Sequence, residues 1–176
     1  GQDDRALKYH LNAIKMDPNA PERWLNYGKS LSNLNKADEA LTAYQKAIEL
    51  NPDYAEAWIN LGCAQINLKT FPQALNSFDR ALKINSEFAE AWSNRGNALR
   101  ELKEYAEAVA SYDKAIALNP DHAEAYNDRG VALQALKQLE EALASYDKAI
   151  VLKPNYAEAW YSRGVTLGEL GRFEEA

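Results

Sequence analysis

The segment AEAWSNRGNAL, Ala89 to Leu99, places several chemically capable side chains next to one another. Its arginine, Arg95, could bind a phosphate or a carboxylate, and Ser93 and Asn94 could donate or accept hydrogen bonds. Close copies of the segment recur every 34 residues, and they begin at Pro21, Ala55, Ala123 and Ala157. Each candidate residue therefore has to be judged together with its counterparts in the other copies.

Composition and charge restrict the class of protein. The chain has 176 residues, of which 47% are hydrophobic, as is typical of a folded protein. The net charge of -6 disfavours a nucleic-acid partner, since neutralising phosphates requires a surface rich in Lys and Arg. No apolar run approaches the roughly 18 residues of a membrane span, and the acidic start is unlike a signal peptide. The single Cys63 excludes an intrachain disulfide, and we expect a cytoplasmic location.

Each copy of the repeat predicts two helices. Counted from the first residue of each copy, places 4, 11 and 14 carry large residues such as Trp92, Leu99 and Leu102, which fall on one helical face. A second helical pattern follows, for example at residues 140–152, with Tyr146 on its apolar face. Prolines that stop the second helix follow in most copies, at Pro52, Pro120 and Pro154.

A glycine stands at place 8 of every copy. Glycine in a helix interior costs roughly 1 kcal/mol relative to alanine, so its recurrence predicts a close helix contact. The five glycines are Gly28, Gly62, Gly96, Gly130 and Gly164.

The pattern resembles the tetratricopeptide repeat (TPR). The residues that carry the resemblance are Trp58, Leu61, Gly62, Ala74, Phe78 and Ala81, with Pro52 before them. Gln65, Ser86 and His10 depart from the usual pattern. The resemblance implies an all-α fold, a right-handed superhelix of antiparallel helix pairs whose first helices line a concave groove. It also implies binding of a peptide segment of a partner protein, with neither catalysis nor a cofactor.

The register of the repeat gives expected boundaries within a single array. We expect full repeats at residues 21–54, 55–88, 89–122 and 123–156. Residues 1–20 are expected to form the second helix of a partial repeat, and residues 157–176 the first helix of another.

Place 7 suggests ion pairs between repeats. It holds Arg95, Arg129 and Arg163, and sixteen residues before each arginine stands an aspartate. Where place 7 is Tyr27 or Leu61, the aspartate is absent as well. Planar guanidinium groups suit such paired positions. The sequence therefore predicts the pairs Asp79–Arg95, Asp113–Arg129 and Asp147–Arg163.

Place 6 suggests a row of hydrogen-bonding side chains in the groove that the resemblance implies. Side-chain amides can both donate to and accept from an extended peptide backbone. The row consists of Asn26, Asn60, Asn94, Asp128 and Ser162. The alternative is that these are polar residues on a solvated face.

Other expected groove residues are largely uncharged, which favours an extended, uncharged ligand segment. They are Leu25, Lys29, Ile59, Cys63, Ile66, Asn67, Asn97, Arg100 and Asn127. Place 2, by contrast, is always glutamate: Glu22, Glu56, Glu90, Glu124 and Glu158. These glutamates argue against a basic clamp for a terminal carboxylate. They could form an acidic ladder, but a residue such as Asp53 three positions earlier favours a capping box at the helix start.

No catalytic constellation, metal site or cofactor site stands apart from the repeat. His10 and His122 are far apart and have no ligand-spaced partners, so we expect no metal. Two alternatives to peptide binding remain open. One is head-to-tail self-association through terminal half-repeats, in which Trp160, Leu167 and Leu170 would be uncovered at one end, and Leu7, Leu11, Ala13 and Ile14 at the other. The other is a regulatory array of a larger enzyme.

Overall fold

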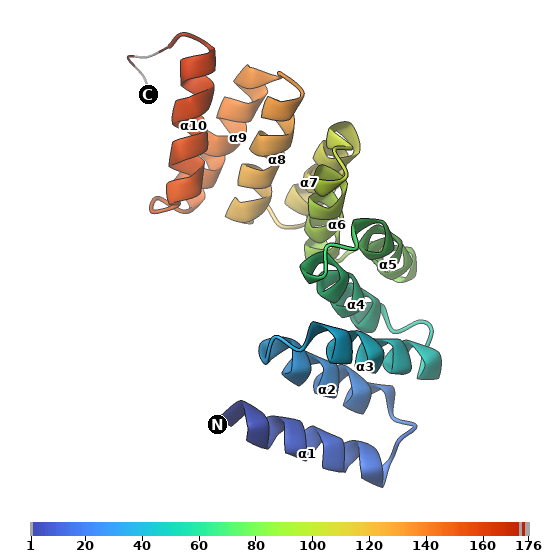
Figure 1. Ribbon diagram of the computed structural model, residues 1–176. Helices are drawn as coiled ribbons and strands as arrows, with labels where there is room; N and C mark the ends of the chain where they lie inside the picture. Colours follow the sequence, from blue (N-terminus) through green and yellow to red (C-terminus); the bar gives the residue numbers. More distant parts are fainter. Residues whose placement is uncertain (1, 173, 175–176) are drawn as a thin grey trace. The chain divides into compact units, whose positions relative to one another are not determined.

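The computed structural model describes residues 2–172 and 174. Within these residues the chain forms ten helices and no strand, so the expected all-α helical repeat fold is confirmed (Figure 1). The helices are α1 (Gln2–Met16), α2 (Pro21–Asn33), α3 (Ala37–Leu50), α4 (Ala55–Asn67), α5 (Phe71–Ile84), α6 (Ala89–Glu101), α7 (Tyr105–Leu118), α8 (Ala123–Ala135), α9 (Leu139–Leu152) and α10 (Ala157–Glu169).

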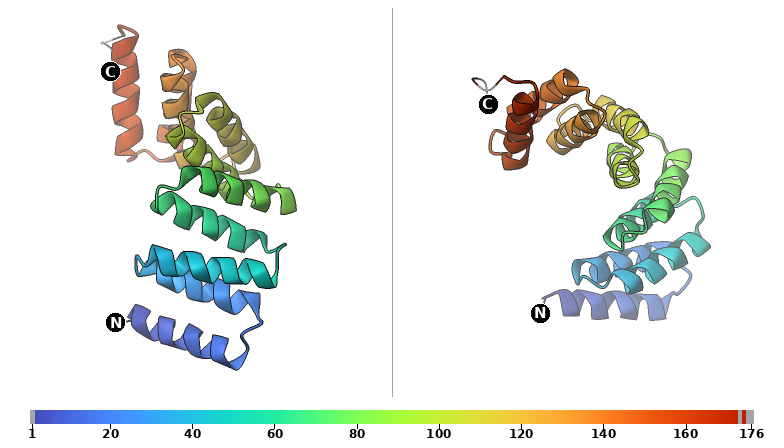
Figure 2. Two further views of the ribbon diagram at one scale, coloured as in Figure 1. Left: turned by 45° about the vertical axis from the view of Figure 1, so that its right-hand side comes forward. Right: turned by 45° about the horizontal axis from the view of Figure 1, so that its top comes forward.

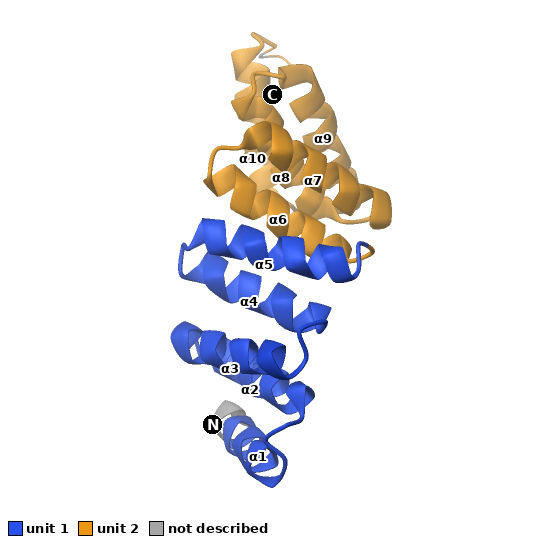
Figure 3. Cartoon of the chain, turned by 90° about the vertical axis from the view of Figure 1, so that its right-hand side faces the viewer, with its two compact units in different colours: residues 1–86 blue, residues 87–176 orange. Residues whose placement is uncertain are grey.

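The helices fall into two compact units, residues 1–86 and residues 87–176, a division that the repeat pattern did not predict (Figure 3). In the first unit α2 pairs with α3 and α4 pairs with α5, while α1 packs on α2. In the second unit α6 pairs with α7 and α8 pairs with α9, while α10 packs on α9 and α8. The partners of each pair lie side by side in the views of Figure 2.

Each expected full repeat contains one of these helix pairs, and each expected partial repeat contains one helix. Residues 1, 173, 175 and 176, at the ends of the two expected partial repeats, lie outside the described residues.

The first helix of every pair ends in the same backbone motif. In α2 the N–H of Lys36 donates to the carbonyl of Leu31, and the N–H of Asn35 donates to the carbonyl of Ser32, which is the Schellman arrangement. The motif requires a left-handed residue, with φ of 57° at Asn35. Equivalent left-handed residues end α4, α6, α8 and α10; they are Lys69, Lys103, Lys137 and Gly171.

The place-8 glycines lie against an aromatic ring of the paired helix, as the sequence predicts. A Cβ added to Gly130 would lie 2.5 Å from Cε1 of Tyr146, and one added to Gly28 would lie 2.5 Å from Cε1 of Tyr44. Both tyrosines are almost completely buried. No side chain larger than hydrogen fits there without displacing the ring. Gly164 differs, because a Cβ there would meet nothing within 4 Å.

The expected capping boxes are wrong. The N-cap positions are Ala20, Tyr54, Phe88, His122 and Tyr156, and none of them makes a side-chain cap. Asp53 lies before its helix, where its backbone N–H donates to Asn51 Oδ1 at 3.1 Å. The connecting turn thus uses its own polar residues, and Glu56 is the second residue of α4 rather than the third.

The expected uncovered surfaces are partly wrong as well. Leu167 has no exposed surface, because α10 packs on α9 and α8, and Ile14 of α1 is only 6% exposed. Trp160 is half exposed, as predicted, and Leu11 is exposed.

Candidate functional site

Arg129 connects three helices of the second unit. Its Nε donates to Asp113 Oδ1 of α7 at 2.6 Å, and its Nη1 donates to Ser145 Oγ of α9 at 2.7 Å. Arg163 makes the same contact with its predicted partner, since its Nε lies 2.6 Å from Asp147 Oδ1. The structure therefore contains two of the three predicted ion pairs.

The third predicted pair, Asp79–Arg95, joins residues of different units and stays a prediction. Arg95 donates through Nη1 to Ser111 Oγ of α7 at 2.7 Å. This serine contact, like that of Arg129 with Ser145, was missed in the sequence. The available signal was a serine sixteen residues after each of these arginines.

Gln65, which departs from the family pattern, has a local reason in the structure. In the second repeat place 7 is Leu61, which cannot bond to the corresponding serine, Ser77. Ser77 Oγ instead donates to Gln65 Oε1 at 2.7 Å, and both side chains are buried. The glutamine thus satisfies a buried hydroxyl that the arginine serves in other repeats.

The place-6 side chains differ in accessibility. Asn26 is exposed, whereas Asn60, Asn94, Asp128 and Ser162 are half-buried. Asn60 Nδ2 donates to the carbonyl of Glu56 in its own helix at 2.7 Å, so its Oδ1 is the atom best placed for a ligand.

In the first unit, predicted groove residues gather in a small hollow between α2 and α4, hereafter the α2–α4 hollow. Its volume is about 140 Å³. Lys29 in its wall also pairs with Glu56 of α4. The lining residues are Lys29, Ser32, Asn33, Tyr44, Asn60, Cys63, Ala64 and Asn67. Ile66, which was also predicted for the groove, is half-buried and does not line the hollow.

Three predicted groove residues are buried, and their assignment to the binding surface stays a prediction. Leu25 is 2% exposed, Ile59 is 6% exposed and Asn127 is 5% exposed. Leu25 belongs to the core cluster of the first unit, where it packs with Leu31 and Leu61. At these three residues place 5 lies within the helix packing, whereas Tyr161 at the same place is 76% exposed.

The second unit has a larger hollow, about 600 Å³, between α6, the loop before α8, and α8 itself. We call it the α6–α8 hollow. It brings together three predicted groove residues, Asn94, Asn97 and Asp128. Arg100, which was also predicted to lie in the groove, does not line this hollow. Its Nη2 lies 3.5 Å from Glu101 Oε1. The full lining is Ala89, Glu90, Ser93, Asn94, Asn97, Asn119, His122, Glu124 and Asp128.

The wall of this hollow contains residues that were not assigned to binding from sequence. Glu90 and Glu124 were interpreted as capping residues, and His122 was considered only as a metal ligand. The signal for the glutamates was their recurrence at place 2, one turn before place 6 on the same helix.

The carboxylates of the α6–α8 hollow differ in their surroundings. Burial raises the pKa of Asp128, despite the nearby Arg100. Hydrogen bonding from Lys153, whose Nζ lies 2.8 Å from Oε1, lowers the pKa of Glu124. Asp128 is thus a poorly solvated carboxyl group, and Glu124 is an ionised one with a partner.

Two buried tyrosines of the second unit hold side-chain amides in place. Tyr112 donates its hydroxyl to Asn97 Oδ1 at 2.8 Å, and Tyr146 donates to Gln134 Oε1 at 3.1 Å. Burial raises the pKa of Tyr112, and it raises the pKa of Tyr146 to about 12. Both tyrosines therefore remain protonated donors that orient the side-chain amides in front of them.

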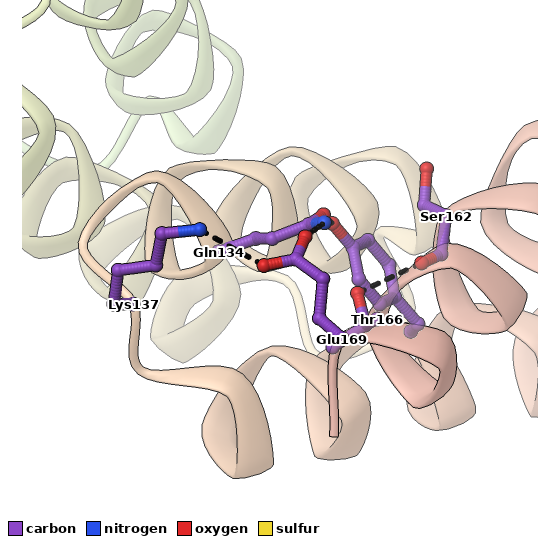
Figure 4. Close-up of polar contacts among 6 residues, drawn as sticks. Gln134, Lys137, Ser162, Thr166 and Glu169 are labelled. Carbon is purple, nitrogen blue, oxygen red and sulfur yellow. Dashed lines mark hydrogen bonds and ion pairs between the residues drawn. The ribbon is translucent and has the colours of Figure 1, made fainter. Parts of the chain in front are cut away.

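A further polar cluster connects the end of α8 to α10 (Figure 4). Glu169 accepts hydrogen bonds from Gln134 Nε2 at 2.7 Å and from Lys137 Nζ at 2.9 Å. These contacts lower the pKa of Glu169. Next to them, Thr166 Oγ1 donates to the carbonyl of Ser162 at 2.8 Å (Figure 4). The two charged groups of this cluster, Lys137 and Glu169, are therefore paired with each other.

Among the described residues, no helix is long and apolar enough to cross a membrane. The same residues contain no group of three or more His, Cys, Asp or Glu side chains that could hold a metal ion.

Comparison with solved structures finds related helical repeat proteins. MamA is 26% identical, with a TM-score of 0.81 over 89% of this chain and 91% of that chain. YrrB, described as a TPR protein with an unusual peptide-binding site, is 26% identical, with a TM-score of 0.81 over 94% of this chain and 86% of that chain. A thermophilic TPR protein of Thermus thermophilus is 25% identical, with a TM-score of 0.74 over 95% of this chain and 91% of that chain.

No curated protein matches the sequence. Family matches, in contrast, extend along most of the chain. The TPR repeat family matches residues 28–69, 96–137 and 135–171, and tetratricopeptide repeat families match residues 55–88 and 77–110. The chain therefore belongs to the tetratricopeptide repeat family.

Proposed function

We propose that this chain is a non-catalytic protein-interaction scaffold that binds an extended peptide segment along its first helices. The observation that supports it most is the gathering of amide side chains in the α2–α4 hollow and the α6–α8 hollow. The structural neighbour YrrB, described as having an unusual peptide-binding site, supports the same type of ligand.

The chemistry of the hollows suits a peptide backbone. An extended segment presents one N–H and one C=O per residue, and a side-chain amide can pair with either group. Asn33, Asn60 and Asn67 supply amides to the α2–α4 hollow, and Asn94, Asn97 and Asn119 supply them to the α6–α8 hollow. Recognition of this kind provides affinity with limited sequence preference, and side chains at the walls add selectivity.

A triple variant tests the proposal. Asn26, Asn60 and Asn94 are changed to Ala, and binding to an array of blocked nine-residue peptides is compared with that of the unchanged chain. We expect the triple variant to lose most of the captured peptides. The matched control changes Gln45 and Asn76, exposed amides of α3 and α5, to Ala and should retain them. Unchanged capture by the triple variant would refute the role of this amide row.

A second candidate function, self-association, is favoured by exposed apolar side chains on α10. Trp160, Tyr161 and Val165 are 50%, 76% and 40% exposed. A second copy could cover them with its own α1, where Tyr9 and Leu11 are exposed. Light scattering over a concentration series tests this candidate, with Val165→Glu and Tyr161→Ser as the variant. A mass that stays monomeric at high concentration would reject it.

A further inference from the structure

We infer that the α6–α8 hollow binds a positively charged side chain, arginine or lysine, of the peptide. This inference rests on the proposed function and adds a chemical preference at one place along the ligand. It differs from the sequence-based expectation of an uncharged ligand segment.

The walls of the hollow are acidic, and no Lys or Arg is among the lining residues. Glu90 from α6 and Glu124 and Asp128 from α8 contribute carboxyl groups, and Asn94 and Asn97 contribute amide oxygens. A volume of about 600 Å³ accommodates a long side chain together with its bound water. A cavity rich in acceptors favours a ligand rich in donors, and a guanidinium group has five N–H donors.

One hydrogen-bonding atom at this wall is left without a partner. His122 lines the hollow, and its Nδ1 is buried with no partner among the described residues. Asn127, which does not line the hollow, donates weakly to Asp128 Oδ1, at 3.4 Å. Asn127 as a whole is only 5% exposed. Since buried polar atoms are normally paired, the unpaired Nδ1 makes His122 a side chain of this wall whose hydrogen bonding the described residues do not complete.

The charges around the hollow leave part of its negative charge uncompensated. Lys153 pairs with Glu124, and Arg100 acts on Asp128 from beside the hollow. Glu158, in contrast, raises the pKa of Asp128, because its negative charge opposes ionisation of that carboxyl group. Burial also raises the pKa of Asp128, because water solvates its ionised form poorly. A cation beside Asp128 would stabilise that ionised form.

The α2–α4 hollow provides an internal contrast. It is lined by amides and by Lys29, and none of its lining residues carries a carboxyl group. A positively charged side chain therefore has a reason to prefer the hollow of the second unit. Because the described residues contain no group of three or more His, Cys, Asp or Glu side chains that could hold a metal ion, an organic cation fits these walls better than a metal ion.

Three blocked nine-residue peptides test the inference. They share an alanine–serine sequence and differ only at the central residue, which is arginine, lysine or citrulline, the neutral analogue of arginine. Binding is followed by fluorescence polarisation, and the site is located from backbone amide shifts in NMR spectra of the whole chain. We expect the arginine and lysine peptides to bind at least tenfold more tightly than the citrulline peptide, with shifts at Glu90, Asn94 and Asp128.

Two isosteric variants locate the preference. The double variant Glu90→Gln, Asp128→Asn should bind the arginine and citrulline peptides equally well. Glu107→Gln with Glu140→Gln makes the same change in net charge at exposed positions of α7 and α9 and should keep the preference. Thermal unfolding of each variant checks the fold. If the double variant is unfolded, the single Glu90→Gln variant replaces it, since Glu90 is exposed.

The possible failures can be told apart. Equal binding of the arginine and citrulline peptides, or shifts confined to residues of α2 and α4, would overturn this inference and leave the scaffold function intact. If none of the peptides binds, both the inference and the proposed function fail. Retention of the tenfold preference by the double variant would also overturn the inference.

Discussion

The two units fill the same position of the helix pair in different ways. In the first unit place 7 is Tyr27 or Leu61, and Leu61 is only 4% exposed within the apolar core cluster. In the second unit the same place is Arg129, whose Nε and Nη1 reach Asp113 on one side and Ser145 on the other. One position thus serves either for apolar packing or for a polar network that crosses three helices.

The comparison shows that the fold does not require a particular chemistry at this position. Apolar packing is non-directional, and NaCl does not screen it as it screens a charge pair. The arginine network fixes directions and positions, but it gains little free energy, because Arg129 and Asp113 remain 23% and 53% exposed. We therefore expect the two units to respond differently to substitution and to ionic strength. Substitutions in both units test this difference, from the largest expected effect to the smallest.

Leu61→Ala in the first unit should have the largest effect. Removing a buried leucine side chain loses its transfer free energy and leaves a cavity, so the free energy of unfolding should fall by about 2–5 kcal/mol. Urea denaturation at 50 mM and at 1 M NaCl provides the measurement. The loss should be the same at both salt concentrations, and a strong salt dependence would contradict the assignment of Leu61 to apolar packing.

Gly28→Ala and Gly130→Ala should have similar, intermediate effects, because the glycine–tyrosine contact is shared by both units. Each new Cβ would lie 2.5 Å from a buried tyrosine ring, which should lower the free energy of unfolding by about 1–3 kcal/mol. Thermal unfolding measures the change. Gly164→Ala is the matched control: nothing lies within 4 Å of its Cβ, so stability should rise by about 1 kcal/mol.

Arg129→Leu should have a smaller effect. It removes the contact with Asp113 and the hydrogen bond to Ser145, but Ser145 keeps its bond to the carbonyl of Glu141. We expect a loss of about 0.5–1 kcal/mol at 50 mM NaCl, which shrinks at 1 M NaCl because salt screens half-exposed charges. Urea denaturation of this variant beside Leu61→Ala measures the contrast. If the two variants responded equally to salt, the expected difference between the two units would be contradicted.

Asp128→Asn should have the smallest effect, and its sign depends on pH. The pKa of Asp128 is raised in the folded chain, so the ionised form is disfavoured by folding. Above that pKa the asparagine variant should be more stable, by about 0.5 kcal/mol. As pH falls through the folded pKa toward the unfolded value of about 3.9, the difference should disappear. Denaturation between pH 4 and pH 7 checks this, and a variant that is less stable at pH 7 would contradict it.

Much of the fold was predictable from the repeat itself. Helix pairs, the glycine contacts and the arginine–aspartate pairs follow from residues that recur at fixed offsets, such as Gly130 with Tyr146 and Arg129 with Asp113. A constant offset places side chains in the same relative position in each repeat. Recurrence therefore carries three-dimensional information that a single occurrence does not.

The candidate site was less predictable, because exposure depends on neighbouring helices. Leu25 and Asn127 directly precede Asn26 and Asp128 in the sequence and were predicted to lie on the same surface as them. In the structure, Leu25 and Asn127 are buried. The start of α4 was also misplaced, since the residues around Asp53 form a turn of their own before the helix. The assembly of Glu90, His122 and Asp128 around one hollow required coordinates, because it combines a helix, a loop and the following helix.

The glycine–aromatic contact has a consequence for how helices can be exchanged. Gly28, Gly62, Gly96 and Gly130 each meet an aromatic ring of the paired helix at the same position. A first helix from one repeat should therefore fit the second helix of another, as an interchangeable part. The arginine network restricts that freedom, since an arginine-bearing α8 also needs an aspartate on the helix before it. Hybrid arrays built from this chain would thus tolerate mixing within a pair more readily than reordering of the pairs.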